Sequence, residues 1–145
     1  MYKFSLGPVL NHRKFLEENL QKELGPLKKQ LVDKKNKLAK LKDSRRQFRS
    51  EWQSKQQQTM TVSESLLYVR FFEKISGKIT QQTEHVSEAE NAVDAKRADL
   101  IEAVKKRKAL EILKEKGFKR YQQRILLNER NFIDEMASVR FKPKG

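Results

Sequence analysis

Apolar residues recur along the first third of the chain in alternating steps of four and three. Ten positions follow this rhythm, and eight of them are apolar: Leu20, Leu24, Leu27, Leu31, Lys34, Leu38, Leu41, Arg45, Phe48 and Trp52. Steps that average 3.5 residues are typical of a helix that packs along one stripe, or seam, against a second helix in a coiled coil. We therefore predict a first helix over residues 8–57.

A second stretch keeps the same rhythm for longer. Its seam positions are Phe72, Ile75, Ile79, Gln82, Val86, Ala89, Val93, Lys96, Leu100, Ala103, Arg107 and Leu110. The following apolar positions, Phe118, Tyr121, Ile125, Asn128 and Phe132, predict a seam displaced after Leu110, with Gly117 inside the slip. We predict a second helix over residues 63–141.

Turn-forming and polar residues divide these stretches. Gly7-Pro8 is typical of a helix start, and Gly25-Pro26 predicts a kink in the first helix. Residues 58–62 lie within a polar segment and form the predicted turn. Thr61-Val-Ser-Glu64 has the form of a capping box, which marks the start of the second helix.

The expected architecture is all-α, with residues 1–145 forming a single antiparallel coiled-coil hairpin, because a short turn makes neighbouring helices antiparallel. If Trp52 lies opposite Leu66, the second helix has no partner beyond about residue 115, and its C-terminal end projects beyond the first helix. An unpaired apolar stripe marks an interaction surface. The periodicity therefore predicts a protein partner.

Charge is abundant and unevenly spread. The chain has 33 Lys or Arg and 19 Asp or Glu residues, a net charge of +14. Residues 28–55 carry a net +8, residues 64–104 a net −3, and residues 105–124 a net +7. The last segment supplies a predicted basic patch that should attract an acidic partner surface: Lys105, Lys106, Arg107, Lys108, Lys119 and Arg120.

The sequence favours no catalytic chemistry. It has no cysteine and no glycine-rich phosphate loop, and His12 and His85 are single and far apart. The acidic pairs Asp134-Glu135 and Glu88 with Glu90 fit solvated helix faces. We predict that the chain is not an enzyme and uses no cofactor or metal. The pI near 10 keeps a nucleic-acid binder open, but no nucleic-acid-binding motif is present, and a protein-binding coiled coil is favoured.

No membrane or secretion segment is expected. The N-terminus lacks the apolar run of a secretory signal, and the densest apolar stretch, Leu66 to Phe72, is interrupted by Arg70. These features predict a soluble, cytoplasmic protein.

Several short motifs, in this order and at these spacings, resemble the FliJ family. They are Tyr2-Lys-Phe-Ser-Leu6 with Val9, Leu10 and Arg13; Tyr68-Val-Arg-Phe71; Lys106-Arg-Lys-Ala-Leu110-Glu; Leu113-Lys-Glu-Lys; Tyr121; and Asn131 to Phe141. The resemblance spans nearly the whole chain. Gly25-Pro26 departs from the family pattern.

The resemblance implies a non-enzymatic component of the flagellar type III export apparatus, folded like the central stalk of a rotary ATPase. Its implied partners are the hexameric export ATPase FliI, whose ring it enters and activates, the export gate protein FlhA, and export chaperones. It would have no dedicated nucleic-acid site. It would be cytoplasmic, and peripheral to the membrane at the flagellar base through its protein partners.

Carried over by position, the resemblance implies two binding sites. The site facing the ATPase ring would comprise Leu6, Leu10, Tyr121, Ile125, Phe132, Asp134, Arg140 and Phe141. The site facing the gate would comprise Tyr68, Phe71 and Ile75. Ile75 is also explained by seam packing, whereas Tyr68 and Phe71 fall off the seam or at its margin.

Two alternatives remain open from the sequence. A stalk protein of a virulence type III secretion system would have the same pattern. A generic basic scaffold or homodimer would bury the projecting stripe against its own copy.

Overall fold

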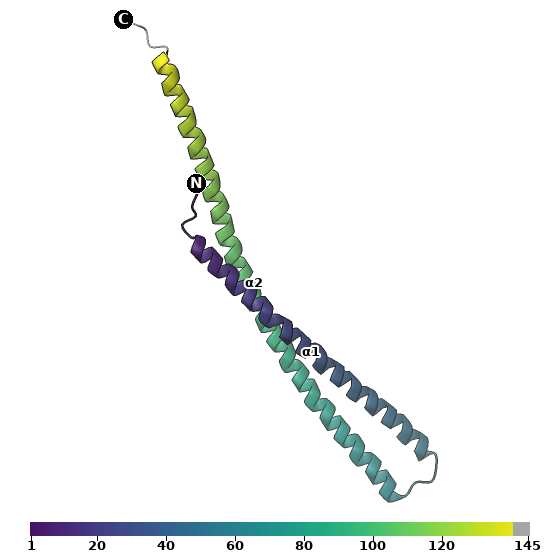
Figure 1. Cartoon of the computed structure of the whole chain (residues 1–145). Coiled ribbons are helices and arrows are strands. Elements are labelled where there is room, and N and C mark those ends of the chain that lie inside the picture. The colour runs from purple at the N-terminus through teal and green to yellow at the C-terminus, as the bar shows by residue number, and fades with distance from the viewer. Residues whose placement is uncertain (141–145) are drawn as a thin grey trace. The chain divides into compact units, whose positions relative to one another are not determined.

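The computed structural model describes residues 1–140, which form two long helices and no strand. Helix α1 spans Gly7–Gln56 and helix α2 spans Val62–Arg140. The chain divides into two compact units: Met1–Glu18 with the part of α2 from Ile101 onward, and Asn19–Leu100. In each unit, α1 and α2 lie side by side and run in opposite directions (Figure 1). The prediction of an all-α helical hairpin is confirmed.

Local hydrogen bonds explain where α2 begins. The backbone N–H of Glu64 donates to Thr61 Oγ1 at 3.2 Å, so Thr61 is the N-cap. At the end of α1, the N–H of Gln58 donates to the Lys55 carbonyl at 3.0 Å and closes the last turn. The connection between the helices is therefore residues 57–61.

Helix α1 continues through Gly25-Pro26. An interior proline removes one backbone hydrogen bond and crowds the preceding turn. Gly25 and Pro26 are exposed and lie away from the seam, and so is Lys22, whose carbonyl loses its helical partner. The proline is thus accommodated without leaving a buried polar group unsatisfied.

In the Asn19–Leu100 unit, the seam of α1 is the predicted one. Between residues 20 and 52, the ten predicted positions are the ones that are not exposed. They face buried residues of α2: Ile75, Ile79, Gln82, Val86, Ala89 and Val93. Lys34 and Arg45 occupy seam positions while remaining partly exposed, which fits packing of their aliphatic stems.

Polar contacts fix the pairing of this unit. Gln82 is 7% exposed, and its Nε2 donates to the Lys34 carbonyl at 3.0 Å. Lys96 Nζ donates to Glu23 Oε2 at 2.6 Å, and this hydrogen bond raises the pKa of Lys96. A buried polar side chain that can form its hydrogen bond in only one register favours that register of a coiled coil.

The unit formed by residues 1–18 and α2 from Ile101 has its own core and ion pairs. Leu10 is 2% exposed. Arg107 donates to the carboxylates of Glu17 and Glu111, and its hydrogen bond to Glu17 is the main cause that raises the pKa of Arg107. Ahead of α1, residues 1–6 form a segment, here called the strap, that reaches α2 through Tyr2.

The predicted slip of the seam after Leu110 is not found as far as Tyr121. Gly117 and Tyr121 are partly buried, at spacings of seven and four that continue the earlier rhythm. Phe118, which the displaced seam would have placed inward, is 44% exposed. The rhythm is hidden in the sequence because its next two positions by spacing are Lys114, which is exposed, and Gly117, which has no side chain.

Candidate partner-binding surfaces

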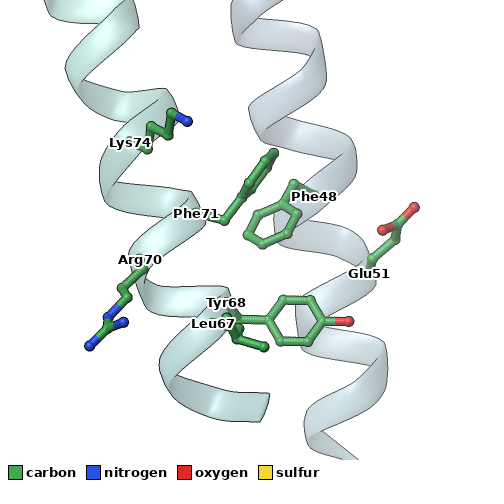
Figure 2. Close-up of a pocket in the computed structure, with 7 residues that line it drawn as sticks. All are labelled: Phe48, Glu51, Leu67, Tyr68, Arg70, Phe71 and Lys74. Atoms are coloured by element: carbon green, nitrogen blue, oxygen red, sulfur yellow. The ribbon is translucent and has the colours of Figure 1, made fainter. Parts of the chain in front are cut away.

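The first candidate surface is an open groove in the Asn19–Leu100 unit, close to the turn between the helices. This groove, here called the turn groove, has a volume of about 530 Å³ and is lined by Phe48, Glu51, Leu67, Tyr68, Arg70, Phe71 and Lys74. Figure 2 shows the Phe71 side chain directed toward Phe48, while Arg70 points away from α1. The floor is therefore apolar and the rim carries charges.

Aromatic stacking holds the floor of the groove in place. The Phe48 ring lies 4.3 Å from Phe71 and 5.2 Å from Tyr68, between ring centroids. Trp52 stacks on Tyr68 at 6.3 Å, nearly parallel. Such aromatic pairs contribute stability beyond that of burying apolar area. They position Phe71 for contact with a partner, since this side chain is still 47% exposed.

Basic side chains dominate the surroundings of the turn groove. Arg70 and Lys74 lie on its rim opposite Glu51. On α1, a second and smaller cavity is lined entirely by cations: Lys42, Arg45, Arg46 and Arg49. The electrostatic field at this end therefore favours a partner with negative charge beside its apolar contact.

The second candidate surface, here called the free stripe, lies on α2 after Arg124. Every residue from 122 to 139 is exposed, although the segment is rich in large apolar side chains. The exposed apolar residues are Ile125, Leu126, Leu127, Phe132, Ile133, Met136 and Val139. Within residues 1–140, no other part of the chain covers them, and Figure 1 shows α2 continuing past the N-terminus. Apolar residues exposed in such number mark a binding surface.

Residues 2–145 match the family described as flagellar FliJ protein. This chain belongs to the FliJ family. No curated protein and no solved structure matches it. Membership supports the role of a flagellar export component, the first of the two secretion systems that the sequence left open.

The gate-facing residues expected from the FliJ resemblance are only partly brought together. Tyr68 and Phe71 both line the turn groove. Tyr68, which was expected off the seam or at its margin, is half-buried and stacks on Phe48 of α1. Ile75 is 7% exposed and packs inside the coiled coil. Phe48 and Leu67 also line the groove, and the sequence did not indicate them, because their place depends on which residues of α1 and α2 meet.

The expected ring-facing residues of this FliJ-family chain are scattered between surface and core. Ile125, Phe132 and Asp134 are exposed on the free stripe, and Leu6 is exposed at the strap. Leu10 is buried and Tyr121 is half-buried. Arg140 is the last residue of α2, and Phe141 lies outside the described residues.

The expected basic patch does not form one uniform surface. Arg107 is half-buried and bound to Glu17 and Glu111. Lys105 pairs with Glu102 at 3.5 Å, and Lys119 with Glu115 at 3.4 Å. Lys106, Lys108 and Arg120 are exposed. Part of the positive charge is therefore already neutralised locally.

Within residues 1–140, no three acidic or histidine side chains gather as metal ligands would. In the same part of the chain, neither helix contains a stretch long and apolar enough to cross a membrane.

Proposed function

We propose that this FliJ-family chain acts without catalysis as the stalk of the flagellar export ATPase. The free stripe enters the hexameric FliI ring and promotes its assembly and activity, and the turn groove contacts the export gate protein FlhA. The chain also escorts export chaperones, a role that rests on the family resemblance. It works in the cytoplasm and reaches the membrane through these partners.

The observation that carries the ring proposal is the change of exposure within α2. The same helix is buried along its seam between Ile75 and Val93, whereas every residue from 122 to 139 is exposed. An α-helix with a long apolar stripe gains stability by burying that stripe against another surface. A single helix of about 10–12 Å diameter is also narrow enough to enter the centre of a ring.

The gate proposal is supported by the turn groove. It offers an apolar floor, a half-exposed Phe71 and cations on the rim. Interfaces concentrate binding energy in a few central aromatic anchors. Ile75 is not part of this contact surface, since it is buried and does not line the groove.

The experiment is light scattering after size-exclusion chromatography, with FliI and a non-hydrolysable nucleotide in one arm and the soluble part of FlhA in the other. The wild-type chain should enter a ring-sized complex at one copy per six FliI subunits. Phe132→Ala with Ile133→Ala should lose FliI and keep FlhA. Leu67→Ala with Phe71→Ala should do the reverse, so each double variant is the control for the other.

Truncation after Lys116 should abolish the FliI complex, because it removes the free stripe. Retained binding by the truncated chain would contradict the ring proposal. A lone protein with a mass near twice 17.2 kDa that ignores FliI would instead mean that the stripe is covered by a second copy.

A further inference from the structure

Gly117 lies inside α2, where glycine weakens a helix relative to alanine. Its position has a structural reason. A Cβ atom built on Gly117 would overlap the hydroxyl oxygen of Tyr2 and lie 3.2 Å from Tyr2 Cζ. Gly77, also in α2, has nothing within 4 Å of such an atom. The Tyr2 side chain therefore packs directly against Gly117, whereas no neighbour constrains Gly77 in this way.

Aromatic contacts and a backbone turn hold the strap against Gly117. The Tyr2 ring lies 5.5 Å from Tyr121 and 5.8 Å from Phe118, between centroids. At the end of the strap, the Gly7 N–H donates to the Phe4 carbonyl at 3.0 Å, where the chain turns into α1. The strap is thus fixed at Tyr2 and again at the start of α1.

Docking of the strap brings Lys3 to the same shallow cavity as Arg120 and Arg124. This cavity has a volume of about 350 Å³, and its lining, here called the strap surface, is Met1, Tyr2, Lys3, Gly117, Arg120, Tyr121 and Arg124. No acidic residue lines it. Within residues 1–140, Lys3, Arg120 and Arg124 have no carboxylate at ion-pair distance, whereas the adjacent Lys119 is paired with Glu115.

Three cations gathered without an anion repel one another, and a bound anion removes that repulsion. Arginine presents a planar set of N–H donors that matches a carboxylate, and the tyrosine hydroxyls offer further donors. A nucleic acid draws its affinity from a long run of phosphate contacts. A single small cavity with three cations fits one or two carboxylates better.

We propose that the strap surface binds the carboxylates of an acidic segment of the protein partner. This inference rests on the proposed function, because it names the chemistry that the partner presents beside the free stripe. Gly117 and Tyr2 are positioning residues. They place Lys3 beside Arg120 and Arg124, and without them the three cations do not face one ligand.

The test uses the full chain, labelled with ¹⁵N, and a short glutamate-rich peptide as the probe. Titration should shift the amide signals of residues 2–3 and 117–124 before those of the other basic segments. Gly117→Ala should weaken peptide binding about tenfold, the loss expected for one charge-assisted contact. Gly77→Ala is the matched control and should leave binding unchanged. Tyr2→Ala should reproduce the loss without altering α2.

A double-mutant cycle tests the composite nature of the surface. Lys3→Ala should weaken binding in the wild-type chain and have no further effect in the Gly117→Ala chain, because the strap is already displaced. Lys28→Ala, an exposed lysine of the other unit, serves as the charge control. Equal binding by the Gly117→Ala and Gly77→Ala chains, or shifts spread evenly over all basic segments, would overturn the proposal.

The choice of ligand is tested separately. An oligonucleotide of the same charge should bind more weakly than the peptide at this surface, and the opposite order would overturn the assignment to carboxylates. Because the peptide arm needs no ATPase, its result stands apart from the proposed function. If the wild-type chain binds FliI, Gly117→Ala should weaken that complex too, and an unchanged complex would exclude the ATPase as the source of the acidic segment.

Discussion

Two stretches of α2 show how one type of residue takes opposite roles. Ile79 lies opposite α1 and is 6% exposed, whereas Ile133 lies on the free stripe and is 64% exposed. Both are isoleucines in the interior of one helix with closely spaced apolar neighbours. Periodicity therefore identifies a helix face that must pack against a partner. The length of α1 decides whether that partner belongs to the same chain or to another protein.

The largest expected effect comes from replacing one isoleucine by alanine in each of the two stretches of α2. Ile79→Ala should destabilise the fold by about 2 kcal/mol, at the low end for buried isoleucine because a two-helix seam collapses easily. Ile133→Ala should change stability by less than about 0.5 kcal/mol. Urea unfolding followed by circular dichroism at 222 nm measures both. Equal losses would mean that the free stripe is covered in the isolated chain.

Replacing the buried amide of Gln82 should separate two properties of the stretch of α2 that packs against α1, its stability and its register. Gln82→Leu should raise stability by about 1 kcal/mol, because an apolar side chain at a buried seam position avoids the cost of desolvating the amide. It should also loosen the register. The chain has no cysteine, so disulfide formation between cysteine pairs introduced one turn apart reports the register directly. Higher stability with a single register would show that Gln82 does not select it.

The two interior glycines of α2 should respond unequally. Gly77→Ala should stabilise the chain by about 0.5–1 kcal/mol, since it improves helix propensity at an open position. Gly117→Ala should gain less, because the added methyl group displaces Tyr2. Thermal unfolding of the two variants gives the comparison. An equal gain would mean that the strap contributes nothing to the stability of the free chain.

The smallest expected effect is the pH dependence of the ion pair between Lys96 and Glu23. The pKa of Lys96 is raised above its ordinary value of 10.5, mainly by the hydrogen bond to Glu23. A raised lysine pKa contributes stability that is fully present below 10.5 and is lost as the pH rises through the folded value. The stability difference between wild type and Lys96→Met should therefore be constant from pH 7 to about 10 and shrink above it. In a Glu23→Gln background this pH dependence should disappear.

The paired stretch could be predicted from the sequence because its signal is local and repeated. The ten seam positions of α1 need only their own spacing to be recognised, and Thr61 with Glu64 marks the start of α2 in four residues. The FliJ resemblance was carried in the same way, by ordered short motifs. Each of these features depends only on residues that are close together along the chain.

The strap surface could not be predicted because its signal is divided between distant residues. In the sequence, Gly117 indicates a weak point of a helix, and only contact with Tyr2 shows that the missing side chain is what matters. The seam through Gly117 to Tyr121 was hidden for the same reason. The contact of Tyr68 with α1 is also hard to recognise from the sequence, because Ser65, three residues earlier and partly buried, is polar.

The net charge of +14 also governs how copies of this chain behave toward one another. At low ionic strength, like charge keeps the exposed apolar faces of different molecules apart. Salt shortens the range of that repulsion, from a Debye length of about 30 Å at 0.01 M to about 3 Å at 1 M, while apolar attraction persists. Free chains should accordingly stay dispersed in dilute buffer and self-associate as salt is added, until a partner occupies the stripe.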